Sequence, residues 1–256
     1  MCLILFAFRH HPRYPLVVAA NRDEFHERPT APASWWDTTP PILAGRDLRC
    51  GGTWFGVSRE GKFAAVVNYR DPDARGTEAP SRGMLVTDFL LERAPCEVFL
   101  DNLRTKGSLY SGFSLLFGDT EHLFCHSNQG ETPALVQPGI HGLSNHLLDT
   151  PWPKVSRGKD RLNKLLSGDR EPDVAELLDL LTDRSLPEDH LLPDTGVGLE
   201  NERLLAPLFI SGKGYGTRSS TVLIIGLDGT VSFTERTWHG DPDHGTTVSH
   251  RFHIEK

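Results

Sequence analysis

Changes in hydrophobic period divide this sequence and limit the folds open to it. Short apolar runs typical of strands fill the first 69 residues, and helical spacing replaces them over 81–104. Strand-like runs return over 113–145, a second pair of helical segments follows within 154–183, and a hairpin pattern lies at 220–237. Strands do not alternate singly with helices, which argues against a doubly wound sheet or an α/β barrel. The order favours an α+β domain of antiparallel sheets covered by helix pairs.

Turn and cap residues mark individual elements within this order. Asp228-Gly229, the strongest short hairpin signal in the chain, separates two apolar runs. Ser81 is a predicted N-cap, and Pro95 is expected in the first turn of the next helix. No internal repeat or interdomain linker is visible, so we predict a single domain over residues 1–256.

Charge and composition exclude several classes of protein. Lys and Arg total 27 against 34 Asp and Glu, a net charge of −7 that argues against a general nucleic-acid binder. The cysteines form no CxxC and the 12 histidines no HExxH, so neither a disulfide framework nor a metal site is predicted. Residues 2–8 lack the basic head of a signal peptide, and no apolar run is long enough for a membrane span. These features predict a cytoplasmic protein.

Hairpin register draws attention to Cys2. If the first turn is centred near residue 12, Cys2 lies opposite Asn21 or Arg22. A guanidinium favours the thiolate, and an α-amine exposed by loss of Met1 can act as a base. The alternative is that Cys2 is only a small apolar strand residue. Strict alternation sends Arg22 and Asp23 to opposite faces, so a bulge would be needed to aim both at Cys2.

A series of short motifs follows in order along nearly the whole chain. It comprises Met1-Cys2, the block Asn21-Arg22-Asp23-Glu24 with Arg28-Pro29, Gly51 to Gly56, Asn68-Tyr69-Arg70, Ser81-Arg82-Gly83, Gly142 to Asn145, Asp149 to Lys154 and Tyr215 to Thr221. This series resembles the NRDE family, which includes the eukaryotic transport and Golgi organisation protein 2. The four-letter block alone would be weak, but the ordered series is specific.

The resemblance implies a fold and a set of site residues. The fold would be the four-layer αββα arrangement of N-terminal nucleophile hydrolases, with two antiparallel sheets between helix pairs. In cysteine members such as penicillin V acylase and bile salt hydrolase, an exposed cysteine attacks an amide carbonyl. By resemblance the catalytic residues are Cys2, Arg22 and Asp23, with Asn68 or Asn145 as oxyanion donor and Arg218 completing the site. Ligand contacts are expected from Asn21, Glu24, Trp54 and Tyr69.

Two functions remain open at this point. The first is hydrolysis of a small amide or thioester through Cys2, with no cofactor required. The second is a non-enzymatic carrier, because the family has been linked to haem trafficking and to acyl-CoA and lipid homeostasis. Haem would then be a transported ligand, held without thioether bonds because no CxxCH is present. The Trp35-Trp36 pair is a possible apolar lip in a loop. We predict that Cys2, Arg22 and Asn145 converge in one cleft.

Overall fold

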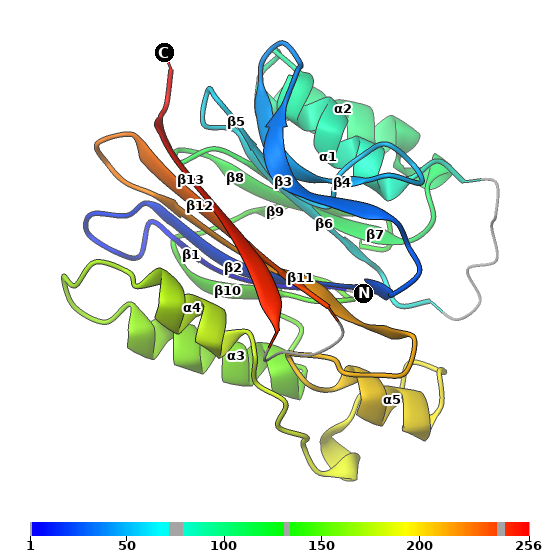
Figure 1. The fold of residues 1–256 in the computed structure, drawn as a ribbon. Helices are drawn as coiled ribbons and strands as arrows, with labels where there is room; N and C mark the ends of the chain where they lie inside the picture. The colour runs from blue at the N-terminus through cyan, green and yellow to red at the C-terminus, as the bar shows by residue number, and fades with distance from the viewer. Residues whose placement is uncertain (1, 72–78, 131–133, 240–243, 256) are drawn as a thin grey trace.

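Two antiparallel sheets lie face to face between two layers of helices in the computed structural model (Figure 1). The structure describes residues 2–71, 79–130, 134–239 and 244–255. Met1, whose removal the predicted chemistry requires, lies outside these ranges. The arrangement confirms the predicted α+β class with four αββα layers.

The first sheet has six described strands, and its order places the N-terminal strand inside the sheet rather than at an edge. In spatial order the strands are β10 (Gly139–Leu143), β1 (Cys2–Phe8), β2 (Leu16–Phe25), β11 (Tyr215–Ile225), β12 (Thr230–Trp238) and β13 (Gly245–His253).

The second sheet has seven described strands in sequence order, so it is built from successive hairpins and a single long connection. They are β3 (Thr30–Trp36), β4 (Ile42–Asp47), β5 (Phe55–Ser58), β6 (Phe63–Asn68), β7 (Phe113–Gly118), β8 (Leu123–Ser127) and β9 (Ala134–Leu135).

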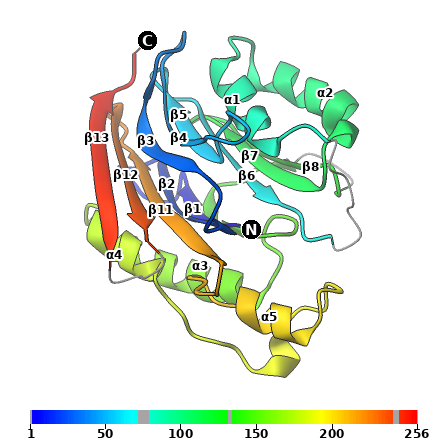
Figure 2. The same ribbon diagram turned by 45° about the vertical axis from the view of Figure 1, so that its right-hand side comes forward.

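Helices cover the outer face of each sheet, as Figure 2 shows from the side. One pair, α1 (Arg82–Leu91) and α2 (Cys96–Lys106), covers the seven-stranded sheet, and α1 packs on β4 to β7. The other pair, α3 (Pro153–Leu165) and α4 (Val174–Leu180), covers the six-stranded sheet. The shorter elements are α5 (Leu199–Leu205) and the 3-10 turns η1 (Gly107–Leu109) and η2 (Asp189–Leu191).

Strand alternation separates the layers. On β1 the side chains of Ile4 and Phe6 enter the core between the sheets, whereas Leu3 and Leu5 pack under the helices. Both sets are buried, so β1 reads as a continuous apolar run. Cys2 shares the face of Ile4 and Phe6 and therefore points between the sheets.

Several elements differ from the sequence expectation. The Trp35-Trp36 pair lies on β3 rather than in a loop: Trp36 is buried, and Trp35 packs against Phe252 of β13. Residues 239–256 are polar and residues 184–216 are rich in Pro and Gly, so the sequence predicts no regular element in either. In the structure the first segment contains the edge strand β13 and the second contains α5. Polar and Pro-rich composition hid these elements. Among the described helices, none is long and apolar enough to cross a bilayer.

Candidate active site

Cys2 pairs directly with Arg22 at the open end of the β1–β2 hairpin, away from the turn. This is one of the two predicted pairings. The main-chain carbonyl of Cys2 accepts a hydrogen bond from Ser144 Oγ at 3.2 Å, which ties the other side of β1 to the end of β10. The thiol lines a cavity of about 230 Å³ where the two sheets separate. Other described residues around the cavity are Arg22, Asp23, Glu24, Arg28, Asp47, Cys50, Thr53, Trp54, Val66, Asn68, Ala79, Pro80, Ser81, Arg82, Gly83 and Ser111.

The Arg22 guanidinium lies over an indole ring. Its central carbon lies 4.2 Å from the centre of the Trp54 ring, a cation–π arrangement. Nη1 donates to Thr30 Oγ1 at 3.4 Å, and Nη2 lies 3.9 Å from a Glu24 carboxylate oxygen. The side chain is only 5% exposed, so these contacts fix the guanidinium beside Cys2.

The environment of Cys2 keeps its thiol protonated at rest. Burial raises the pKa of the Cys2 thiol, and the negative charge of Asp23 raises it further. The positive charge of the N-terminus, a hydrogen bond from the Asp23 main chain and, least, the Arg22 guanidinium lower it. The net shift is upward, so the guanidinium alone does not produce a resting thiolate. A nucleophilic role for this thiol therefore needs a base that removes its proton during the reaction.

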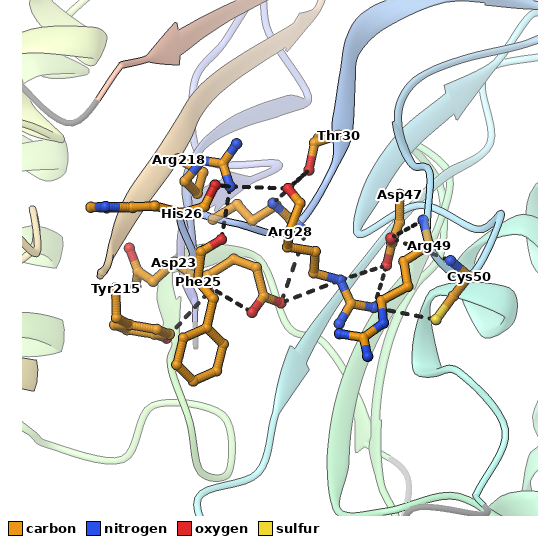
Figure 3. A network of polar contacts seen from close by, with 12 residues as sticks. Asp23, Phe25, His26, Arg28, Thr30, Asp47, Arg49, Cys50, Tyr215 and Arg218 are labelled. Carbon is orange, nitrogen blue, oxygen red and sulfur yellow. Dashed lines mark hydrogen bonds and ion pairs between the residues drawn. The ribbon is translucent and has the colours of Figure 1, made fainter. Parts of the chain in front are cut away.

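Asp23 occupies the opposite face of β2 from Arg22, as strict alternation requires. Thr217 Oγ1 donates to Asp23 Oδ1 at 2.7 Å. The Tyr215 hydroxyl donates to the Asp23 carbonyl at 3.2 Å (Figure 3). The bulge that would aim both side chains at Cys2 is not found between Arg22 and Asp23. The β2–β11 register shifts instead in the neighbouring strand, between Thr217 and Ser219. Asp23 still contributes to the cavity wall, and burial raises the pKa of its carboxyl group.

A buried lysine lies behind Asp23, and sequence reasoning did not single it out. Lys154, at the start of α3, is 3% exposed and donates from Nζ to the Leu205 carbonyl at 3.1 Å. Burial lowers its pKa to about 8, while the charge of Asp23 acts in the opposite direction. Lys154 ends the Asp149–Lys154 motif, so the sequence carried a signal for it. The charge of Lys154 helps to compensate that of Asp23.

The two asparagines expected near the oxyanion play different structural parts. Asn68, at the end of β6, lines the cavity, and its side chain makes no hydrogen bond within the described part of the chain. Asn145 is fully buried outside the described cavity lining and donates from Nδ2 to the Asn68 carbonyl at 2.9 Å. Thus Cys2 and Arg22 meet in the cavity as predicted, whereas Asn145 supports the strand end that carries Asn68.

Arg218 lies at the register shift of β11 and holds the chain that follows β2. Its Nη1 donates to the carbonyls of Phe25, His26 and Arg28 at 2.8, 3.0 and 3.2 Å (Figure 3). The guanidinium is not among the described groups that line the cavity. Its contacts fix the turn from which Arg28 reaches the site.

Of the four residues expected to contact the ligand, two line the cavity and two lie elsewhere. Glu24 and Trp54 line the cavity. Asn21 faces the helices, where Nδ2 donates to two main-chain carbonyls at 2.9 and 2.8 Å. The Tyr69 hydroxyl lies 2.7 Å from His146 Nε2, outside the described cavity lining.

An ion pair between Arg28 and Asp47 forms one side of the cavity wall. Arg28 donates from Nε and Nη2 to Asp47 Oδ2 at 3.0 and 2.6 Å, and Nη2 also lies 3.3 Å from the Cys50 sulfur (Figure 3). Two main-chain N–H groups, of Arg49 and Cys50, donate to the other Asp47 oxygen. Both oxygens of the Asp47 carboxylate therefore accept hydrogen bonds. Burial alone would raise the pKa of Asp47, but these hydrogen bonds and the Arg28 charge outweigh it, so the pKa is lowered.

No histidine is found among the described residues that line the cavity. Within residues 2–71, 79–130, 134–239 and 244–255, no cluster of three or more His, Cys, Asp or Glu side chains could hold a metal ion.

Solved structures with the same layers place the fold in a known class. A penicillin V acylase from Agrobacterium tumefaciens superposes with a TM-score of 0.54 at 11% identity, covering 96% of this chain and 90% of that one. The Caenorhabditis elegans ortholog of N-acylethanolamine-hydrolyzing acid amidase gives a TM-score of 0.53 at 11% identity, covering 87% and 92%. The protein therefore has an N-terminal nucleophile hydrolase-like fold.

Sequence relatives identify the family within that class. The family described as Transport and Golgi organisation 2 matches residues 1–240. The Transport and Golgi organization protein 2 homolog of Bos taurus is 36% identical over the full length of both chains. The Drosophila melanogaster Transport and Golgi organization protein 2 is 30% identical, covering 100% of this chain and 98% of its own. The chain belongs to the Transport and Golgi organisation 2 family, which confirms the NRDE resemblance.

Proposed function

We propose that this protein is a cysteine N-terminal nucleophile hydrolase that cleaves a small amide or thioester through Cys2. The observation that carries the proposal is the position of Cys2. Cys2 is the first residue of the interior strand β1, it pairs with Arg22, and it lines a cavity between the sheets. A cysteine that served only as a small core residue would not require a buried guanidinium beside it.

The chemistry begins when Met1 is removed and the α-amine of Cys2 becomes available. The thiol gives its proton to this amine, and the sulfur attacks the substrate carbonyl carbon to form a tetrahedral intermediate. When the intermediate collapses, the bond to the leaving amine or thiol breaks and the proton passes to the leaving group. Water then hydrolyses the acyl-thioester, releasing the acid and restoring the thiol.

The raised pKa of the Cys2 thiol supports this route over attack by a preformed thiolate. An α-amine has a pKa of about 7.7 to 8, close to neutral, which suits a group that accepts and returns a proton. Arg22 stabilises negative charge that develops on sulfur, and the Asp23 carboxylate orients the ammonium that forms.

Asn68 is the better of the two oxyanion donors. Its side-chain amide lines the cavity without a described hydrogen bond, so it can donate to the carbonyl oxygen as negative charge develops. Asn145 positions Asn68 by holding its carbonyl. The alternative function, a non-enzymatic carrier of haem or acyl-CoA, stays a prediction. No histidine among the described residues of the cavity wall supplies an imidazole that would favour haem.

Intact mass and acyl transfer test the proposal. The purified protein should begin at Cys2, hydrolyse at least one member of a panel of acyl 4-nitroanilides and acyl thioesters, and carry the acyl mass on Cys2 in a quenched reaction. Cys2→Ala should lower the rate by about 10³-fold or more. Cys50→Ala, which removes another thiol from the cavity wall, should leave the rate unchanged. Turnover that survives in Cys2→Ala, or absence of any acyl adduct on a chain beginning at Cys2, would refute the proposal.

A further inference from the structure

One guanidinium in the cavity has no part in the chemistry proposed above. Arg82 is the first residue of α1, is partly buried, and lines the same cavity as Cys2. Its Nη1 donates to the Gly112 carbonyl at 3.0 Å. Within the part of the chain that the structure describes, no carboxylate forms an ion pair with it.

The other two cavity arginines are satisfied by protein groups. Arg28 is paired with Asp47 at 2.6 Å and lies 3.8 Å from Glu24. Arg22 is stacked on an indole and lies 3.9 Å from the same Glu24 carboxylate. Arg82 is therefore the cavity arginine without a described carboxylate partner. A guanidinium remains charged even in a buried site, and burial here disfavours that charge. Among the described residues Glu24 acts on it only through its charge, without a hydrogen bond or an ion pair, so the N–H donors that do not reach Gly112 are available to a ligand.

Two glycines allow the start of α1 to reach the cavity. A Cβ atom on Gly52 would lie 2.6 Å from the Gly83 carbonyl carbon, and one on Gly83 would lie 3.0 Å from the Thr53 carbonyl oxygen. The main chains therefore pack closer than any side chain would permit. This contact fixes the first turn of α1, with Ser81 and Arg82, at the cavity wall. The first N–H groups of a helix have no acceptor within the helix, so they add positive potential there.

We propose that Arg82 is the specificity residue of this cavity and binds an anionic oxygen group, a carboxylate or a phosphate, on the substrate. The proposal rests on the hydrolase function proposed above and narrows its substrate class to amides or thioesters that carry such a group near the scissile bond. Arg82 presents a planar fork of N–H donors, which matches a carboxylate or phosphate with two parallel hydrogen bonds.

Alkylation of Cys2 tests this without requiring turnover. Iodoacetate and iodoacetamide differ only in a carboxylate against a neutral amide, and peptide mass spectrometry gives the rate at Cys2 for each. In Arg82→Gln the ratio of the iodoacetate rate to the iodoacetamide rate should fall by about tenfold, because the attracting charge is lost. The matched control is Arg93→Gln, an exposed arginine just beyond the other end of α1, which should keep the wild-type ratio. An unchanged ratio in Arg82→Gln would overturn the proposal.

A second variant separates loss of charge from loss of folding. Arg82→Lys keeps the charge but not the planar fork, so it should retain part of the preference for iodoacetate, more than Arg82→Gln does. A preference lost equally in the Lys and Gln variants would count against charge recognition. Protection of Cys2 from iodoacetamide by glutarate but not by inorganic phosphate assigns a carboxylate ligand, and the reverse assigns a phosphate. Protection by neither would refute the anion site.

The two proposals fail in different ways. If the iodoacetate preference depends on Arg82 but no acyl compound is turned over, the anion site stands and the hydrolase proposal fails. Glutaryl 4-nitroanilide carries a carboxylate and pentanoyl 4-nitroanilide does not. If each protein, wild type and Arg82→Gln, hydrolyses these two substrates with the same kcat/KM, the hydrolase stands and the anion site fails.

Discussion

Glu235 is a buried carboxyl group whose ionisation should set the pH dependence of stability. It lies on the inter-sheet face of β12, is 1% exposed, and accepts a hydrogen bond from the Ala33 N–H at 2.7 Å. Burial raises its pKa from 4.5 to about 7, against the opposing effects of the Ala33 N–H and the Arg22 charge. The native protein therefore holds a proton between these pH values that the unfolded chain has released.

The sign and size of the effect follow from that difference. Because the folded chain binds more protons in this range, the free energy of unfolding falls as the pH rises from about 4.5 to 7. Each pKa unit corresponds to about 1.4 kcal/mol, so ionisation of Glu235 costs about 3 kcal/mol above pH 7. Glu235→Gln keeps the acceptor for Ala33 and removes the titration. It should be more stable than wild type at pH 8, by a margin that shrinks by about 2–3 kcal/mol at pH 5.

Urea unfolding followed by tryptophan fluorescence, repeated between pH 5 and pH 8, measures this margin. Differences between variant and wild type cancel the contributions of other titrating groups. Glu60→Gln, an exposed glutamate in the β5–β6 turn, is the matched control and should show no such margin. If the free energies of wild type and Glu235→Gln change with pH in parallel, the reasoning about the buried carboxyl group is wrong.

Two further substitutions probe the support of the site. In Gly45→Ala the new Cβ would lie 2.5 Å from the Trp54 ring, so the indole must move. We expect the free energy of unfolding, measured by urea denaturation, to fall by about 1–3 kcal/mol. The tryptophan emission should shift as well. Unchanged emission would contradict this. Asn21→Ala leaves two buried carbonyls without their donor and should cost about 2–4 kcal/mol in the same assay, while the iodoacetamide rate at Cys2 stays at the wild-type value. A changed rate at Cys2 would instead indicate a role for Asn21 in the cavity.

The parts of the site that sequence reasoning reached are those set by local structure. A short hairpin fixes its own register, so the pairing of Cys2 with Arg22 follows from the position of one turn. The same alternation predicts that Asp23 faces away, and the structure shows it bonded to Thr217 on that other face.

The parts that it missed depend on contacts between distant segments. Asn145 holds the carbonyl of a residue 77 positions away, and no local pattern says which of the two asparagines reaches the cavity. Arg82 becomes a cavity residue only because Gly52 and Gly83 let the start of α1 approach the loop before β5. The strand around Trp35 was hidden because its neighbours include proline and its pairing with β4 shifts register.

The central position of β1 has a practical consequence for handling the protein. On one side β2 pairs with this strand as far as Cys2, and on the other side β10 pairs with it as far as Ile4. Ser144, just after β10, donates to the Cys2 carbonyl, and Cys2 lines the cavity. Any affinity tag joined ahead of Cys2 would be attached beside the cavity that Cys2 lines. A tag joined after β13 would leave from an edge strand at the far end of the molecule (Figure 1). Purification tags therefore belong at the carboxyl terminus.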